Sequence, residues 1–301
     1  MAEFFSVLIN VVSPVFGIVV VGFLLGGRLQ LQARTLTRVA YYLFAPAFIF
    51  QAISGADIPL DSALRMIAFI VLTHLVGVLF AAGIGRLLGK SKEMIAALVM
   101  IAAFGNVGNY GLAVIRFRFG DISVAPSSLY FVGISITAFI LCVGAAGWAK
   151  GGSKGAVWGV AKTPVLWAAI PALLVSVGGV SVPLMLARMV SLLADAMIPV
   201  MLFALGLQLL EQRRVSLAAD VWLASAIRLL LVPAVACLMA IPFGLSTVET
   251  AAGILQAGMP TAIFAAIIAK ENDILPDFVT SVVVVSTLAS LVTLTLLMVM
   301  L

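Results

Sequence analysis

The sequence predicts an all-α polytopic membrane protein with ten transmembrane helices, built as two inverted five-helix repeats. Hydrophobic residues make up 64% of its 301 residues and charged residues only 10%, with a mean hydropathy of +1.27. Soluble domains do not have this composition. Apolar stretches of about 20 residues, the length of a helix that crosses a bilayer, recur along the whole chain. Two of these stretches are interrupted by glycine or proline, at positions 153 residues apart.

Short loops rich in Gly, Pro, Asp, Ser or basic residues separate the expected spans, as is typical of connections between helices. We place the spans at residues 4–27, 35–54, 62–88, 94–115, 124–149, 155–178, 184–210, 217–242, 248–269 and 277–300. The first span follows a single charge, Glu3, and lacks the basic segment of a cleavable signal peptide. We therefore expect it to be retained as a membrane helix.

The basic residues fall mainly in alternate loops. Twelve of the seventeen lie on one predicted side: Arg28, Arg34, Arg38, Arg86, Lys90, Lys92, Lys150, Lys154, Lys162, Arg213, Arg214 and Lys270. Four lie on the other side: Arg65, Arg116, Arg118 and Arg188. Because basic loops stay in the cytoplasm, both termini are expected outside. The pI of 9.5 therefore reflects orientation in the bilayer and does not indicate a nucleic-acid partner.

The two halves of the chain, residues 1–150 and 151–301, are predicted to be repeats. Similar residues recur in the same order at offsets of 150 to 154 positions, and chance recurrence among 12 prolines is the alternative. The matched positions are Pro14 and Pro164, Pro46 and Pro199, Val107 and Pro260, and His74 and Arg228. Because each half has an odd number of spans, the second half must enter the membrane from the opposite side.

The two interrupted stretches are the best candidates for a binding site. The first is 104–111 and the second is 257–261. Broken backbone is tolerated at membrane depth only where protein buries it or where it lines a polar cavity. Paired breaks in two halves indicate a transporter site near the midplane, where half-helix N-termini favour anions. The candidate substrate-binding residues here are Asn106, Gly108, Asn109, Tyr110, Gly258, Pro260 and Thr261. Small neighbours are expected to let the two breaks approach closely.

Three ionisable residues lie near the middle of predicted spans, where a charge costs about 2.5–3.5 kcal/mol. Arg228 is either the anchor of a substrate carboxylate, held by two parallel hydrogen bonds, or the partner of a protein carboxylate, or a side chain that reaches the interface. Asp195 either carries a coupling proton or neutralises Arg228 or Arg188. His74, the single histidine, is the second coupling candidate, and packing is its alternative role.

Both interrupted stretches resemble motifs of a known family. Residues 106–110, Asn-Val-Gly-Asn-Tyr, resemble the Asn-Pro-Asn-x-Tyr crossover motif of the auxin efflux carrier family, with Val107 in place of the proline. Pro260 is kept in the second crossover, while Met259 and Thr261 stand where plant members have asparagine. Residues 163–184 and 193–206 are also similar to the family. The departures fit a bacterial permease better than a plant hormone carrier.

This resemblance implies a scaffold domain from spans 1, 2, 6 and 7 and a transport domain from spans 3–5 and 8–10. Spans 4 and 9 would cross within the transport domain. Relatives include plant auxin exporters and bacterial permeases for malonate and malate. A homodimer formed through the scaffold domain is one expected arrangement, and the bacterial cytoplasmic membrane is the expected location.

No enzyme signature is present. The sequence has neither a His-Glu-x-x-His motif nor a phosphate-binding loop, and its one His and two separated cysteines predict no metal or other cofactor. We expect a secondary transporter of a small organic anion, a mono- or dicarboxylate, that works by alternating access in an elevator-like or rocking motion. Its expected partners are this anion, the lipid bilayer and coupling protons. The alternative is a membrane receptor or channel with the same fold.

Overall fold

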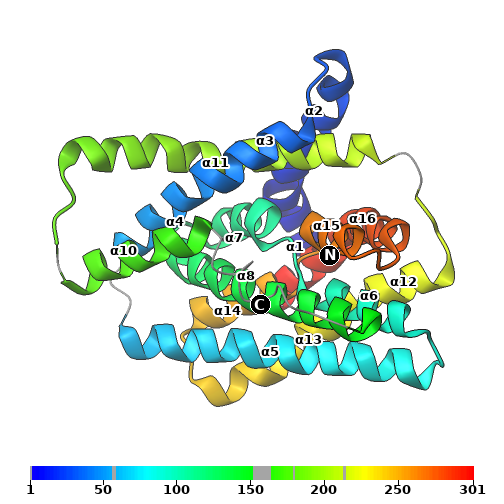
Figure 1. The fold of residues 1–301 in the computed structure, drawn as a ribbon. Coiled ribbons are helices and arrows are strands. Elements are labelled where there is room, and N and C mark those ends of the chain that lie inside the picture. Colours follow the sequence, from blue (N-terminus) through cyan, green and yellow to red (C-terminus); the bar gives the residue numbers. More distant parts are fainter. Residues whose placement is uncertain (1, 56–58, 152–163, 179, 213–214) are drawn as a thin grey trace.

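The computed structural model describes residues 2–55, 59–151, 164–178, 180–212 and 215–301 (Figure 1). All regular elements in these residues are helical, and the prediction of an all-α membrane protein is confirmed. The first half contains α1 (Ala2–Val7), η1 (Leu8–Val12), α2 (Ser13–Arg28), α3 (Ala33–Val39), η2 (Ala40–Phe44), α4 (Ala45–Ser54), α5 (Leu60–Leu87), α6 (Lys92–Ala103), η3 (Val107–Gly111), α7 (Leu112–Phe119), η4 (Asp121–Ser123) and α8 (Val124–Lys150).

The remaining elements follow the predicted boundary between the halves. They are α10 (Pro164–Gly178), α11 (Leu184–Glu211), α12 (Ala219–Ala226), η5 (Ile227–Leu231), α13 (Val232–Ala240), η6 (Ile241–Phe243), α14 (Thr247–Ala257), α15 (Ile263–Glu271) and α16 (Pro276–Met300). Lys154, Lys162, Arg213 and Arg214, which contribute to the predicted orientation, lie outside the described residues.

Seven continuous helical segments are long and apolar enough to cross a membrane. They are Ala2–Arg28, Ala33–Ser54, Leu60–Leu87, Asp121–Lys150, Leu184–Glu211, Ala219–Phe243 and Pro276–Met300. The predicted spans 94–115 and 248–269 are each divided into two shorter helices, and the predicted span 155–178 lies partly outside the described residues. The protein is thus polytopic, while the total of ten spans stays a prediction.

The helices pack in two groups. In one group α11 packs against α2, α3 and α4, and α10 packs against α4. In the other, α5 packs against α6, α8 and α13, α14 packs against α8 and α13, and α16 packs against α12 and α15. Figure 1 shows α11 with α2 and α3 at one edge of the molecule and α5 with α13 at the opposite edge. The α6–η3–α7 and α14–α15 segments belong to the second group.

Three π-helical turns stand just before prolines in otherwise continuous helices. The turns η1, η2 and η5 precede Pro14, Pro46 and Pro233. A proline within a helix has no N–H to donate, and its ring clashes with the carbonyl of the preceding turn. A locally widened turn relieves this clash and re-aims the side chains within it. The turn η5 is the one that carries Arg228.

Glycine allows α2 and α11 to touch backbone to backbone. A Cβ atom on Gly22 would overlap the carbonyl of Phe203, and one on Gly206 would overlap the carbonyl of Val19. Gly17, five residues earlier on α2, has open space where its Cβ would stand. The crossing of these two helices therefore requires the absence of a side chain at particular positions.

We expect Gly22→Ala to lower the thermal unfolding temperature of the detergent-solubilised protein. The added methyl group must push α2 away from α11, and overpacking of this kind costs about 1–3 kcal/mol. Gly17→Ala is the matched control, because it adds the same group on the same helix without a clash. Equal melting temperatures for the two variants would contradict the close crossing.

Candidate functional site

The two broken helices meet through their main chains. Gly105 and Thr261 form an antiparallel bridge. The N–H of Asn106 donates to the carbonyl of Pro260 (2.7 Å), and the N–H of Ala262 donates to the carbonyl of Phe104 (2.9 Å). Two N–H groups and two carbonyls that leave the helical pattern at the breaks are thus satisfied by the opposite break. This pairing meets part of the requirement that lipid imposes on any interrupted helix.

Arg228 joins both breaks from the neighbouring helix. Its side chain is fully buried, with Nε donating to the carbonyl of Met259 (2.7 Å) and Nη1 donating to the carbonyl of Ala102 (2.6 Å). Ala102 lies in the last turn of α6, and Met259 follows the end of α14. Carbonyl groups at a helix C-terminus carry a partial negative charge that favours a cation. These two helix ends therefore compensate the buried charge of Arg228.

Arg228 takes neither of the structural roles considered from the sequence. It is buried, so it does not reach the interface, and no ion pair links it to a carboxylate within the described residues. Its Nη2 atom is buried and has no hydrogen-bond partner among the residues that the structure describes. A Cβ atom on Gly105 would overlap this same Nη2 atom, so Gly105 leaves the space that the guanidinium occupies.

The predicted polar residues of the crossover lie together. Asn106 and Asn109 are each 5% exposed, and their side-chain amides have no hydrogen-bond partner within the described part of the chain. Thr261 is fully buried, its N–H donates to Ser286 Oγ (3.1 Å), and its own hydroxyl has no partner among the described residues. Tyr110 is buried, with its ring edge-on to that of Phe16 at 5.5 Å between centroids. The crossover thus holds polar groups that its own fold does not use.

The glycines of the breaks make room for different neighbours. A Cβ atom on Gly111 would overlap the side-chain amide oxygen of Gln256, so Gly111 lets the two breaks approach as expected. Gly108 instead lies against Phe131 of α8, and Gly258 lies against Leu297 of α16, at 2.9 and 2.8 Å from a Cβ atom placed there. Gly108 and Gly258 therefore make room for the neighbouring helices α8 and α16, and that they also let the two breaks approach each other stays a prediction.

His74 on α5 is buried and has one hydrogen bond. Its Nδ1 lies 2.9 Å from the carbonyl of Ile70, so Nδ1 carries the proton in this contact. Nε2 has no hydrogen-bond partner in the described parts of the chain, and the ring stands edge-on to Tyr130 at 5.9 Å between centroids. Both rings lie within electrostatic reach of Arg228. The structure therefore brings His74 near the crossover, as a hydrogen-bonded residue with one free nitrogen.

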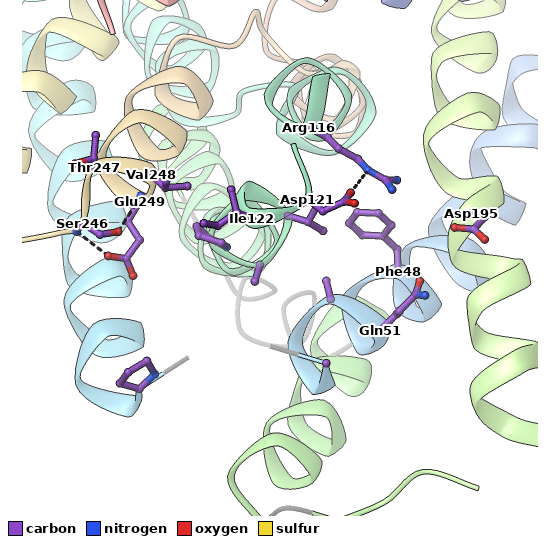
Figure 2. Close-up of a pocket in the computed structure, with 16 residues that line it drawn as sticks. Phe48, Gln51, Arg116, Asp121, Ile122, Asp195, Ser246, Thr247, Val248 and Glu249 are labelled. Carbon is purple, nitrogen blue, oxygen red and sulfur yellow. Dashed lines mark hydrogen bonds and ion pairs between the residues drawn. The ribbon is translucent and has the colours of Figure 1, made fainter. Parts of the chain in front are cut away.

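A cavity of about 780 Å³ lies between the two groups of helices (Figure 2). Its polar lining comes from α4, from α7 and the turn after it, from α11 and from the start of α14: Gln51, Arg116, Asp121, Asp195, Ser246, Thr247 and Glu249. Asp195 lies here, and neither Arg228 nor the asparagines of the crossover are among the lining residues. The structure thus does not bring Asp195 together with Arg228. No ion pair joins Asp195 to Arg188 in the part of the chain that the structure describes.

Sequence reasoning missed Arg116, Asp121 and Gln51 as possible site residues. Arg116 entered it as one of the basic residues on the outer side, and the other two were assigned no role. A signal was present, because Arg116 and Asp121 are oppositely charged and closely spaced at the end of a broken span. Such pairs are also common on solvated loops, so the spacing alone would not have singled them out.

Comparison with known proteins agrees with this architecture. The family model described as "Membrane transport protein" matches residues 7–152 and 153–298. The chain belongs to this family, that of the auxin efflux carriers. Its members are membrane transporters and not enzymes, so this protein is a multi-pass membrane protein of a transporter family. No group of His, Cys, Asp and Glu suited to a metal ion occurs in the described residues.

The relatives come from archaea, bacteria and plants. An "Uncharacterized transporter" of Methanothermobacter thermautotrophicus is 29% identical over 88% of each chain. A "Putative malonate transporter" of Rhizobium meliloti is 25% identical over 95% of this chain and 93% of its own. A "Probable auxin efflux carrier component 1b" of Oryza sativa is 34% identical over 38% of this chain and 21% of its own. Similarity to the first two therefore extends over nearly the whole length.

We expect Gly105→Ala to destabilise the protein by displacing the Arg228 guanidinium. Each hydrogen bond from a charged donor contributes about 1.5–3 kcal/mol, and both carbonyl partners would be weakened. Gly83→Ala on α5 is the control, since open space surrounds that position. The measurement is a double-mutant cycle of thermal unfolding with Arg228→Met. If Gly105→Ala costs the same with and without the guanidinium, the two residues are not coupled.

Proposed function

We propose that the protein is a secondary transporter that carries a small organic anion, a mono- or dicarboxylate, by alternating access. The observation that carries this proposal is the crossover itself. Its main-chain groups are bound by the opposite break, by Arg228 and by Ser286, while the side-chain amides of Asn106 and Asn109 have no partner among the described residues. Polar groups that the fold does not need are available to a ligand. Gly108, Tyr110, Gly258, Pro260 and Thr261 complete the proposed site.

Charge favours an anion at this place. No carboxylate lies in either break, and Arg228 places a buried positive charge directly behind Gly105. The helices that resume after each break, η3 with α7 and then α15, begin at the crossover. The first N–H groups of such helices lack partners in their own helix and carry partial positive charge. In this proposal Arg228 acts on the anion through its charge while its hydrogen bonds hold the breaks.

The packing of the helices supports two bodies that move relative to each other. The group with α2, α3, α4, α10 and α11 would form the scaffold, and the group with the crossover would form the transport domain. Movement of the second group against the first would expose the site to each side in turn. The family model matches the chain twice, over 7–152 and 153–298, which supports the proposed division into repeats at 1–150 and 151–301. Each repeat is proposed to contribute five of the ten spans.

Energy coupling is proposed to involve Asp195 first and His74 second. Moving one charge through 100 mV is worth about 2.3 kcal/mol, so uptake of an anion into a negative cell requires a driver, whereas export does not. Asp195 is exposed and lines the cavity beside the group of helices proposed to move. The name "Putative malonate transporter" of one relative supports a carboxylate as the cargo.

We expect the purified protein to bind malonate or another small carboxylate and to move it into proteoliposomes. Asn106→Ala should reduce flux about tenfold while leaving the folded state intact, because it removes a polar group that no other side chain uses. Asn10→Ala is the control, since Asn10 is an exposed amide far from the crossover in sequence. Binding without flux would indicate a receptor, and currents far above carrier rates would indicate a channel.

Topology provides a separate test. We propose that the protein lies in a bacterial cytoplasmic membrane with both termini outside, as the distribution of basic residues predicts. In a cysteine-free background, Lys90→Cys should react with an impermeant thiol reagent only after the membrane is opened. Ile122→Cys, at an exposed position of the predicted outer loop, should react in sealed cells. Labelling of position 90 from outside would be incompatible with the ten-span topology.

A further inference from the structure

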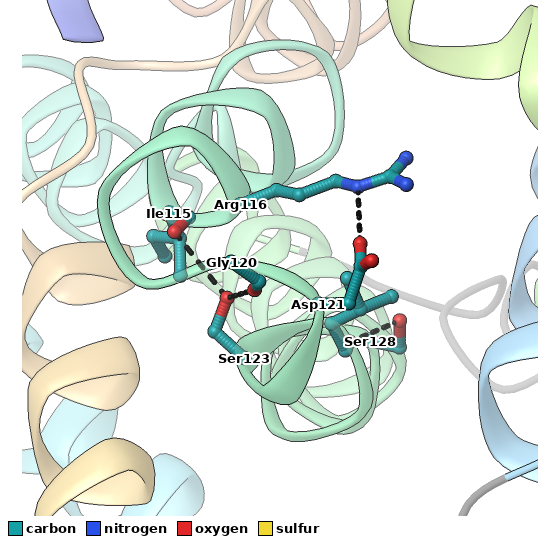
Figure 3. A network of polar contacts seen from close by, with 7 residues as sticks. Ile115, Arg116, Gly120, Asp121, Ser123 and Ser128 are labelled. Carbon is teal, nitrogen blue, oxygen red and sulfur yellow. Dashed lines mark hydrogen bonds and ion pairs between the residues drawn. The ribbon is translucent and has the colours of Figure 1, made fainter.

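The wall of the cavity contains an arginine that is held by a local turn (Figure 3). The helix α7 ends at Gly120, whose φ of +72° reverses the chain. The hydroxyl of Ser123 donates to the carbonyls of Gly120 (2.7 Å) and Ile115 (3.3 Å), which fixes the turn against the end of α7. The turn returns Asp121 to Arg116, and Nε of Arg116 donates to Oδ1 of Asp121 at 2.8 Å. Asp121 therefore positions the guanidinium of Arg116.

Asp121 accepts a hydrogen bond from one nitrogen of this guanidinium, Nε. Nη1 and Nη2 of Arg116 have no hydrogen-bond partner within the described residues, and 43% of the side chain is exposed. In Figure 2 the guanidinium points away from α7 toward the side of the cavity where Asp195 lies. A guanidinium with a free edge is suited to hold a carboxylate. Among the described residues that line the cavity, Arg116 is the single basic one.

The three acids of the cavity differ in what they already bind. Asp121 pairs with Arg116. Glu249 accepts a hydrogen bond from the hydroxyl of Ser62 (2.6 Å) and another from the N–H of Ser246 (2.8 Å), which caps α14. Asp195 is exposed on α11 and has no partner within the described part of the chain. The cavity thus offers one free cationic edge and one free carboxylate, which come from opposite groups of helices.

Arg228 differs from Arg116 in its burial and in the number of its nitrogens that already donate a hydrogen bond. It is fully buried, and two of its three nitrogens donate to main-chain carbonyls. An anion that replaced those contacts would release the ends of both half-helices. Binding of an anion to Nη1 and Nη2 of Arg116 breaks no such contact, because its one hydrogen bond to the described residues uses Nε.

We propose that the cavity is a carboxylate-binding site separate from the crossover, in which the free edge of Arg116 binds the anion and Asp195 competes for the same guanidinium. This inference rests on the proposed function, since the ligand is taken to be the transported anion. The site lies on the side of the membrane that the basic residues predict to be outside. An anion would bind there before, or after, it occupies the crossover.

Competition between Asp195 and the bound anion for Arg116 makes anion binding depend on the protonation of Asp195. An ionised Asp195 repels a carboxylate bound to Arg116, whereas a protonated Asp195 does not. Asp121 and Glu249 also face the cavity, but each is already bound to a donor. Binding of an anion at Arg116 should therefore favour proton uptake by Asp195. This connects the coupling residue proposed above to a substrate contact on the opposite wall.

The test is malonate binding by the full-length protein in nanodiscs, measured by calorimetry, together with the KM of flux in proteoliposomes. Arg116→Gln should weaken binding and raise KM by about tenfold, and Arg116→Lys should recover part of the loss. Asp195→Asn should tighten binding and remove its dependence on pH. Arg118→Gln is the control, because Arg118 is two residues along the same helix and donates to the carbonyl of Met298 instead of lining the cavity.

The outcomes separate this site from the proposed function. If wild-type protein binds and moves malonate but a folded Arg116→Gln variant does so with unchanged affinity and KM, the site at Arg116 is excluded while the transporter remains. Weaker binding in Asp195→Asn would exclude competition, because it would make Asp195 a ligand. If the wild-type protein neither binds nor moves malonate, acetate or succinate, the proposed function fails, and this site fails with it.

Discussion

The hydrogen-bonding demand of the main chain within a membrane governs this structure. Two helices stop in the apolar interior, and each leaves carbonyl and N–H groups that lipid cannot satisfy. The crossing resolves this demand by pairing Asn106 with Pro260 and Ala262 with Phe104. Arg228 completes the arrangement by binding a carbonyl near the end of each first half-helix. Gly105 leaves the space that the guanidinium of Arg228 occupies in this arrangement.

Two arginines, Arg228 and Arg116, place positive charge in different surroundings within this apolar protein. Arg228 is buried and its donors are largely used, so its positive charge is a fixed property of the crossover. Arg116 is partly exposed and is held by a single bond to Asp121. One cation can therefore shape the electrostatic potential around the breaks without moving, while the other can exchange partners. The cavity lies where the two groups of helices meet, which places the exchangeable charge at the proposed sliding surface.

The sequence predicted the helical membrane fold and the two breaks, because apolar length and Gly or Pro interruptions act locally along the chain. It did not predict what Arg228 binds. Its partners are carbonyl groups of Ala102 and Met259, and every residue has a carbonyl, so no sequence pattern identifies them. It also placed Asp195 beside Arg228, because both lie halfway along their spans. Depth along a helix does not determine the face, and Asp195 lies in the cavity on α11.

The two breaks are joined by main-chain hydrogen bonds, which do not require particular side chains at the bonded positions. Val107 stands where a proline is usual, and its N–H donates to the carbonyl of Gly105 (2.8 Å), so the chain still turns. The main-chain hydrogen bonds of the crossing therefore do not depend on the chemical type of the side chains at positions 107, 259 and 261. Side chains that face a cargo can in this way be exchanged for others of similar size while the pairing that holds the two breaks together is kept.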